Sequence, residues 1–357
     1  MPAPLVPIEI REIPDPVIEP GGILLETIAS EVCGTDVHLH HGRLAGVPYP
    51  IIPGHVSVGR VLESRGVTHD AMGEALRTGD VVTFYDVHGI CGSCWHCLVA
   101  RQPNRCAHRR VYGITMSAAD GAFGGWAERI YLKPGVRVLR LPEPLTADDV
   151  MAGGCGLFTG YGAVERSTMA MGDTVVVQGA GPVGLGAVLF AGLRGAGMVI
   201  AIGAPDSRLA LARGFGADLV LGLEPSAIER EAAVRAATGG RGADVVIEAT
   251  GNPAAIAQGL GLLRDGGTYV IAGHYTDTGD ATINPHRHIN RKHADVRGQW
   301  GTDFHHVVGA LRMAAHHHDR FPLAGAIGAR YPLKAAGAAL AAVERLDVTK
   351  AIIMPNA

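Results

Sequence analysis

Four of the six cysteines in this chain lie close together, and their spacing is that of a metal site. They are Cys91, Cys94, Cys97 and Cys106. Four thiolates at such spacings suit one zinc ion, which they surround tetrahedrally without leaving a position open. The alternative is a cluster of buried thiols without metal, and disulfides are a poor explanation in a reducing compartment. We predict a structural zinc lobe over residues 88–110.

The other two cysteines, Cys33 and Cys155, are far apart in the sequence, and His55 lies between them. Two thiolates and one imidazole hold zinc with a fourth position open to water or substrate, as in catalytic zinc sites. A single buried cysteine or histidine is more often part of a core. Spacing alone therefore leaves a ligand set and three core residues as alternatives.

A glycine-rich turn follows the apolar segment 175–178 and precedes a helical segment. In the pattern Gly-x-Gly-x-x-Gly, the glycines permit a tight turn, close approach of a pyrophosphate and close helix packing. The helix N-terminus also favours the phosphate charge. The motif alone fits plain turns as well, but a strand at 198–203 follows at the distance typical of dinucleotide binding. We assign to the cofactor Gly179, Gly181, Pro182, Val183 and Gly184.

The end of that second strand bears on the choice between NAD and NADP. An acidic residue there usually binds the ribose hydroxyls of NAD, but Gly203 occupies the position. The missing acid would admit the 2′-phosphate of NADP, yet no arginine follows at once, and Arg208 is the nearest. Asp206 could serve the ribose from the adjoining loop. We expect NAD, with NADP as the open alternative.

Two kinds of structure must position these residues. The first half alternates short apolar runs with Gly, Pro and Asp turns, which predicts a β-rich domain. From position 173 onward, apolar runs alternate with helical segments, which predicts a parallel sheet covered on both faces and an α/β fold class. We expect a nucleotide-binding domain, 157–300, inserted between two parts of a catalytic domain, 1–156 and 301–357. The expected strands are 22–28, 57–63, 80–85, 174–179, 198–203, 218–222, 244–250, 268–273 and 295–300.

The bulk composition excludes some partners. The 357 residues carry a net charge of −3 without any basic tract, so nothing favours a nucleic acid or an anionic membrane surface. No apolar stretch approaches the roughly 20 residues that span a bilayer. Residues 1–22 lack the features of a signal peptide. We expect a cytoplasmic protein of two domains.

Several short motifs occur in one order along the chain. They are Cys33-Gly-Thr-Asp36, Gly54-His55, the four-cysteine lobe, the segment GAFGGWAE at 121–128, the segment around Cys155 and the glycine turn at 179–184. With these motifs the chain resembles the zinc-containing medium-chain dehydrogenases, the alcohol and polyol dehydrogenase superfamily, over essentially its whole length. The resemblance implies a GroES-like β-rich catalytic domain and a Rossmann doubly wound parallel-sheet domain. It also implies a homodimer or homotetramer.

The resemblance further implies roles for individual residues. Cys33, His55 and Cys155 would hold a catalytic zinc, which with the lobe makes two zinc ions per chain. Thr35 would contact the substrate oxygen, and His38 would relay the proton to solvent. The carboxylate of Asp36 would lie behind His55 and orient its imidazole.

Three further positions match the cofactor contacts of the family. Thr159 and Val183 match residues on the nicotinamide side, and Lys350 matches a basic residue near the pyrophosphate. A lysine so near the C-terminus is, by default, a solvated surface charge.

The chain departs from the family pattern at three places. Val56 stands where a glutamate that can swing toward the metal usually follows the histidine. The last gap of the cysteine lobe has eight residues in place of seven, with Pro103 the apparent insertion. The third departure is the missing acid at Gly203.

The expected function is reversible hydride transfer between an alcohol or its carbonyl form and a nicotinamide cofactor. Zinc would lower the pKa of a bound alcohol, and the cofactor would accept hydride. Secondary, polyol and cyclic alcohols all remain open. The alternatives are a zinc-independent quinone or enoyl reductase on the same frame and a non-catalytic, zinc-stabilised binding protein.

Overall fold

The structure is a computed structural model that describes residues 1–321 and 323–357. It divides into two compact units. The first unit contains Met1–Gly154 and Asp303–Ala357, and the second contains Cys155–Thr302. These boundaries lie two residues from the expected ones. The chain therefore leaves the first unit once, completes the second as one continuous segment, and returns.

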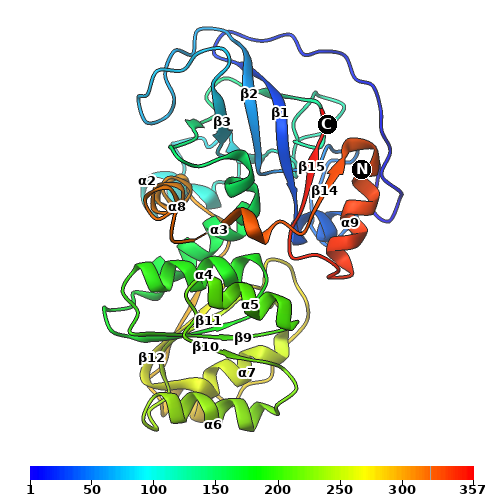
Figure 1. Ribbon diagram of the computed structural model, residues 1–357. Helices are drawn as coiled ribbons and strands as arrows, with labels where there is room; N and C mark the ends of the chain where they lie inside the picture. The colour runs from blue at the N-terminus through cyan, green and yellow to red at the C-terminus, as the bar shows by residue number, and fades with distance from the viewer. Residues whose placement is uncertain (322) are drawn as a thin grey trace. The chain divides into compact units, whose positions relative to one another are not determined.

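The first unit is built on a mixed seven-stranded sheet (Figure 1). Its strand order is β14-β15-β1-β2-β3-β7, and β6 pairs with β1. The central pairs are antiparallel, and the apolar inner faces of β1, β2 and β3 enclose a core that includes Leu25, Val61 and Val82. The strands are β1 (Ile23–Val32), β2 (Ser57–Ser64), β3 (Val81–Phe84), β6 (Arg129–Leu132), β7 (Val138–Arg140), β14 (Ala329–Pro332) and β15 (Ala351–Met354).

Smaller elements of the first unit surround this sheet. A two-stranded ribbon, β4 with β5, lies at the base of the cysteine lobe. The ribbon strands are β4 (Val87–His88) and β5 (Arg110–Val111). The helices are α1 (Gly34–His40), α2 (Trp95–Leu98), α8 (Phe304–His316) and α9 (Ala336–Glu344), with the short turns η1 (Pro103–Arg105), η3 (Leu323–Ala326) and η4 (Leu333–Ala335).

Helix α3 (Ala147–Ser167) carries the chain from the first unit into the second and is broken within its length. Gly154 has φ 51° and ψ −147°, so the element is two helices joined at a kink. The second unit begins immediately after this glycine.

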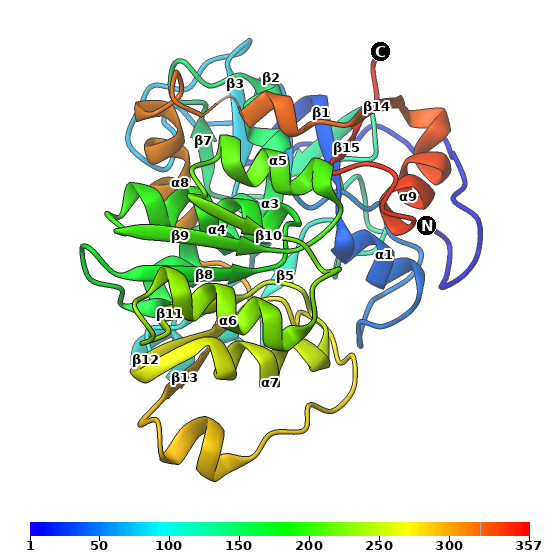
Figure 2. The same ribbon diagram turned by 60° about the horizontal axis from the view of Figure 1, so that its bottom comes forward.

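The second unit is a six-stranded parallel sheet with helices on both faces. Its order is β10-β9-β8-β11-β12-β13, which is the doubly wound order 3-2-1-4-5-6 of a Rossmann domain. Figure 2 shows these strands with α4 and α5 on one face and α6 and α7 on the other. The strands are β8 (Thr174–Gln178), β9 (Met198–Ile202), β10 (Leu219–Leu221), β11 (Ala243–Glu248), β12 (Leu263–Ile271) and β13 (Asp295–Gly298), and the helices are α4 (Pro182–Leu193), α5 (Asp206–Gly214), α6 (Ala227–Ala237), α7 (Pro253–Leu262) and the π-helical η2 (His286–Asn290).

The expected strands correspond to observed ones, and the α/β fold class is confirmed. The largest difference is in β12, which begins at Leu263 and not at position 268. Its first residue pairs with Ala243 ahead of a register shift, so the strand is longer than its apolar run. No helix of the described residues is both long and apolar enough to cross a bilayer.

Candidate metal and cofactor sites

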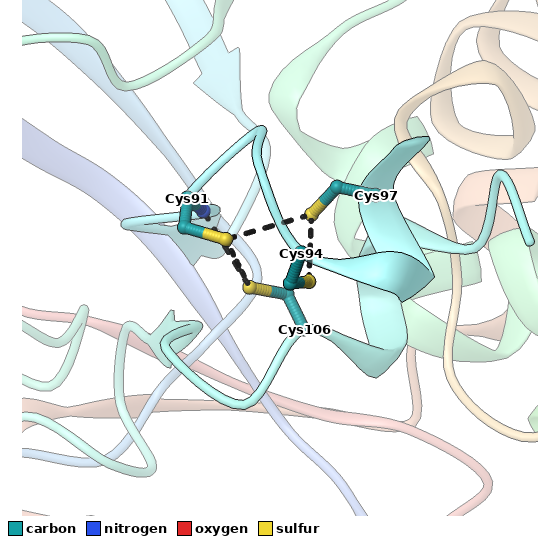
Figure 3. A group of neighbouring side chains, drawn as sticks. All are labelled: Cys91, Cys94, Cys97 and Cys106. Carbon is teal, nitrogen blue, oxygen red and sulfur yellow. Dashed lines mark hydrogen bonds between the residues drawn. The ribbon is translucent and has the colours of Figure 1, made fainter. Parts of the chain in front are cut away.

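The four clustered cysteines converge on one point, as their spacing predicts (Figure 3). The Sγ atoms of Cys94 and Cys97, and of Cys91 and Cys106, lie 3.5 Å apart, and those of Cys91 and Cys97 lie 4.0 Å apart. Sulfur atoms about 2.3 Å from a tetrahedral zinc ion would be separated by about 3.8 Å. The sulfur positions therefore have the dimensions of a closed zinc site.

The long last gap of the lobe does not displace its fourth cysteine. Pro103 begins the short turn η1, and the backbone N–H of Cys106 donates to the carbonyl of Pro103 at 3.0 Å. This tight turn takes up the extra residue before the chain reaches Cys106. Backbone N–H groups of Ser93 and Cys94 lower the pKa of Cys91 to about 5, which favours the thiolate that a metal requires.

A second group of potential ligands lies in the first unit, at the end of strand β1. The ligand atoms of Glu31, Cys33 and His55 lie within 4.8 Å of one another. Glu31 is the last residue but one of β1, Cys33 is the N-cap of helix α1, and His55 precedes β2, which pairs with β1. All three residues are buried. Antiparallel pairing thus brings together residues that are 24 positions apart in the sequence.

Cys155 joins this group through the continuity of the chain. It is bonded to Gly154, and a Cβ atom on Gly154 would lie 1.9 Å from Glu31 Oε2. The backbone at Gly154 therefore touches the Glu31 carboxylate, and the next residue is the fourth member of the group. The backbone comes this close to Glu31 because residue 154 is a glycine, and any side chain at this position would collide with the carboxylate.

Helix α1 fixes Cys33 by hydrogen bonds at its first turn. The sulfur of Cys33 accepts from the N–H of Thr35 at 3.3 Å, and the N–H of Cys33 donates to Asp36 Oδ2 at 2.9 Å. The expected bond from Asp36 to His55 is not among the contacts of this carboxylate. Oδ1 of Asp36 is buried and lacks a hydrogen-bond partner among the described residues. Asp36 therefore acts first as the capping residue of α1, and orientation of His55 stays a prediction.

Lys350 is not the solvated surface charge that its position in the sequence suggests. Its side chain is 1% exposed, and Nζ pairs with Oε2 of Glu31. The antiparallel register of β1 and β15 sets Val32 against Ala351, which brings Lys350 level with the end of β1. Glu31 pairs with the ammonium group in this structure, and the expected contact of Lys350 with a pyrophosphate stays a prediction.

Negative charge predominates around His55. Burial raises the pKa of Asp36, His55 partly opposes this rise, and Glu31 adds to it. The carboxylates of Glu31, Asp36 and Asp86 all interact with the His55 imidazole, and Lys350 pairs with Glu31. Two potential thiolates, Cys33 and Cys155, belong to the same group of ligand atoms. Such a set of donors suits a divalent cation, and its sulfur and nitrogen atoms suit zinc.

Glu31 is the member of this group that sequence reasoning missed. It lies in the segment IASEVC at 28–33, two positions before Cys33. Alternate residues of a strand share one face, so a carboxylate there should have been expected beside the cysteine. That signal was present in the sequence.

Thr35 and His38 lie on α1, three positions apart and therefore on the same side of the helix. Both are partly exposed. Burial lowers the pKa of His38, and the charges of Arg43 and His41 lower it further. The ring is therefore neutral, and able to accept a proton, at neutral pH.

The glycine turn joins β8 to α4 as expected. Gly179 has φ +108°, and a Cβ on Gly184 would lie 1.8 Å from the carbonyl oxygen of Gly179, so helix and strand meet without side chains between them. A Cβ on Gly181, by contrast, would meet nothing within 4 Å. Gly181 is also the N-cap of α4, and no side chain caps that end. The turn therefore leaves backbone space and N–H groups for a phosphate.

The structure gives a physical reason for the missing acid at position 203. A Cβ on Gly203 would lie 2.9 Å from both the backbone nitrogen and the Cβ of Ala180. Any side chain would therefore displace the glycine turn. Asp206 is exposed at the start of α5, whereas Arg208 is buried there, and burial lowers its pKa. Of the remaining predicted contacts, Thr159 and Val183 lie in the same unit, on α3 and α4.

Two protein-family models match the chain. The model described as alcohol dehydrogenase GroES-like domain matches residues 19–143. The model described as zinc-binding dehydrogenase matches residues 182–316. Together they cover parts of both structural units.

Individual proteins match over most of the chain. 5-exo-Hydroxycamphor dehydrogenase from Pseudomonas putida is 34% identical over 351 residues, which are 97% of this chain and 95% of that protein. Erythritol/L-threitol dehydrogenase from Mycolicibacterium smegmatis is 32% identical over 308 residues, with 81% and 79% covered. The crystal structure of an alcohol dehydrogenase from Thermotoga maritima has a TM-score of 0.90 and 37% identity, with 98% and 94% covered.

Proposed function

The chain belongs to the zinc-binding alcohol dehydrogenases of the medium-chain dehydrogenase superfamily, and from this we propose that it transfers hydride reversibly between an alcohol and NAD(P). One observation carries the proposal. Cys33, His55 and Cys155, which are dispersed in the sequence, belong to a single group of potential ligand atoms. A purely structural protein with a nucleotide-binding fold has no use for this second group.

Cys33, His55 and Cys155 would hold the catalytic zinc, and the four cysteines of the lobe would hold a second zinc. The catalytic ion supplies a Lewis acid that makes a hydroxyl group more acidic or polarises a carbonyl group. The nicotinamide cofactor supplies the hydride acceptor or donor. The glycine turn 179–184 would bind the pyrophosphate of the cofactor.

The chain itself supplies proton transfer and orientation. Thr35 Oγ1 would accept the proton of the substrate hydroxyl while it releases its own hydroxyl proton toward the ring of His38, which would pass a proton to solvent. Asp36 would hold Cys33 in place through the bond to its backbone N–H.

For the substrate we propose a secondary, polyol or cyclic alcohol. The relatives named for hydroxycamphor and for erythritol and threitol support cyclic and polyol alcohols. For the cofactor we propose NAD, since Asp206 is exposed beside the end of β9 while Arg208 is buried. NADP remains the alternative. A homodimer or homotetramer is the proposed assembly.

The test combines metal analysis with an assay. The purified chain should contain about two zinc ions and should reduce NAD or NADP with members of a panel of cyclic, secondary and polyol alcohols. Cys33→Ser and His55→Ala should each remove one zinc ion and abolish turnover while the circular dichroism spectrum stays that of the wild type. Cys97→Ser is the matched control, since it removes a thiolate from the other group.

Each contrary result identifies a rival. Near-wild-type kcat in a variant verified to lack the metal would remove these ligands from the mechanism. A wild-type chain without zinc that reduces quinones or enones would be the zinc-independent reductase. Two zinc ions without any cofactor-linked absorbance change on the panel would point to the binding protein.

A further inference from the structure

Glu31 is a fully buried carboxylate whose two oxygens face different partners. Oε1 lies 3.4 Å from Nε2 of His55, and Oε2 pairs with Nζ of Lys350. The side chain is 0% exposed. Its backbone is fixed on both sides, by the N–H donating to the carbonyl of Val56 at 3.1 Å and by Nε1 of Trp126 donating to the carbonyl of Glu31 at 3.0 Å.

The distance between Glu31 and His55 has a specific meaning. At 3.4 Å it is longer than an ordinary hydrogen bond of about 2.7–3.2 Å. Two ligand atoms that each lie about 2.1 Å from a tetrahedral zinc ion are separated by about 3.4 Å. Oε1 and Nε2 are therefore spaced as two ligands of one ion.

The two oxygens of Glu31 have different surroundings. Lys350 holds Oε2, and the missing side chain of Gly154 leaves room for that pair. Val56, directly before β2, accepts the hydrogen bond from the backbone N–H of Glu31. Its aliphatic side chain has no atom that could bind a metal ion. The carboxylate at this end of the sheet thus comes from Glu31 on β1 and not from the residue that follows the histidine.

We propose that Glu31 is a fourth protein ligand of the zinc ion held by Cys33, His55 and Cys155, and that Lys350 holds the same carboxylate whenever it is off the metal. The inference rests on the proposed function, since it concerns the same ion. It assigns to Lys350 a positioning role at the metal in place of a contact with the cofactor. It also means that the fourth position is closed by an exchangeable carboxylate.

The first experiment measures metal binding directly. Glu31→Gln should lower the affinity for the zinc ion held by Cys33, His55 and Cys155 by about tenfold or more. In the protein substituted with Co²⁺ at that site, it should also change the visible d–d bands, because a neutral ligand or water replaces a carboxylate. Glu26→Gln is the matched control, since Glu26 lies on the same strand with its side chain 44% exposed. It should change neither quantity.

A second pair of variants covers the case in which Glu31→Gln leaves Lys350 unpaired and the chain does not fold. Lys350→Met keeps the carboxylate, and Lys350→Met with Glu31→Gln removes both charges. Lys350→Met should bind zinc at least as tightly as the wild type, because the competing cation is gone. The double variant should bind it about tenfold or more weakly than Lys350→Met.

The outcomes separate this inference from the proposed function. A crystal structure of the zinc-loaded chain should place an oxygen of Glu31 about 2.0–2.2 Å from the metal. Equal affinities and equal cobalt spectra for the glutamine and control variants, with neither oxygen of Glu31 within coordinating distance of the metal in the zinc-loaded crystal, would overturn the inference and leave the dehydrogenase intact. A wild-type chain that takes only the lobe zinc would overturn both.

Discussion

Burial and charge determine what the individual residues near His55 are able to do. Glu31, Asp36 and Lys350 are each at most 1% exposed, so their charges are hardly screened by water. Glu31 and Lys350 form a buried ion pair. Removal of one partner from such a pair lowers the free energy of unfolding by about 3–5 kcal/mol, because the other charge stays buried. Small changes of side chain in this group should therefore have large effects.

His38 is the residue for which pH dependence can be predicted. Its pKa is lowered from the usual 6.5 by burial, so the ring is neutral at pH 7 and accepts a proton there. His38→Ala should slow alcohol oxidation by about tenfold or more at the acid end of the active range, and the loss should fade at high pH, where hydroxide replaces the relay. The measurement is kcat against pH for both proteins.

His69→Ala serves as the control for that profile, since His69 is exposed and its ring forms a hydrogen bond with the neighbouring Thr68. It should leave the profile unchanged. An unchanged profile in His38→Ala itself would remove His38 from the relay.

Gly154 should tolerate no side chain. A Cβ there would lie 1.9 Å from Oε2 of Glu31 and 2.3 Å from Nζ of Lys350, and its φ of 51° is unfavourable for other residues. Gly154→Ala should lower the free energy of unfolding by about 3 kcal/mol or more, from backbone strain and overpacking together. Denaturant unfolding measures the change.

Gly135→Ala measures the loss of stability that backbone strain alone causes. Gly135 also has a positive φ, of 87°, but a Cβ there meets nothing within 4 Å. It should cost only about 1–2 kcal/mol. Equal losses in the two variants would show that crowding against Glu31 and Lys350 contributes nothing.

At the scale of elements, each site depends on a strand or helix end. The end of β1 presents Glu31, the first turn of α1 holds Cys33, and the kink in α3 leads to Cys155. The turn between β8 and α4 presents the backbone for a phosphate. Gly181 and Gly203 in that region differ in the space around them, so their effects on stability and on cofactor binding can be separated by mutation.

Gly203→Ala and Gly181→Ala should give different phenotypes. The first brings a Cβ to 2.9 Å from Ala180 and should cost about 1–3 kcal/mol of stability as well as cofactor affinity. The second meets nothing within 4 Å and should lose cofactor affinity with little loss of stability. Thermal unfolding and titration with NADH measure the two properties. Retained affinity in Gly181→Ala would contradict the phosphate position.

Strand periodicity predicted the fold, and cysteine spacing predicted the four-cysteine group. The resemblance to the family, and not spacing, implied Cys33, His55 and Cys155 as a second group, and Glu31 was missed. Periodicity and spacing could not predict Lys350, because its environment is set by the pairing of β15 with β1, and no local pattern reveals that register. Nor could they show why Gly203 replaces an acid, since the reason is a contact with Ala180 from another segment. Glu31 was readable in principle, as a charge in an apolar strand beside Cys33.

At the scale of the whole molecule, the binding sites are distributed between the two units. The cysteine lobe, Glu31, Cys33, His55 and Lys350 belong to the first unit, whereas Cys155 and the glycine turn belong to the second. All proposed metal ligands except Cys155 thus lie in the first unit, so metal and cofactor should stabilise largely different parts of the chain. A ligand at a concentration of about 100 times its Kd raises the free energy of unfolding of the part that binds it by about 2.7 kcal/mol.

Hydrogen exchange read by mass spectrometry should show this division. Removal of zinc with a chelator should increase exchange in residues 23–40 and 87–111, and addition of NADH should slow exchange in residues 174–193. The wild-type chain without additions is the reference. Exchange that changed uniformly along the chain with either ligand would contradict independent stabilisation of the two units.

The pairing of Glu31 with Lys350 also implies an order of events during synthesis. These residues are 319 positions apart, so at about 5–20 residues per second a ribosome adds the lysine on the order of 15 to 60 seconds after the glutamate. Cys33, His55 and Cys155 all emerge within that interval. The nascent chain therefore contains the proposed zinc ligands before Lys350, which pairs with Glu31, has been made. We expect zinc to be acquired while the chain is still being translated, when no lysine competes for Glu31.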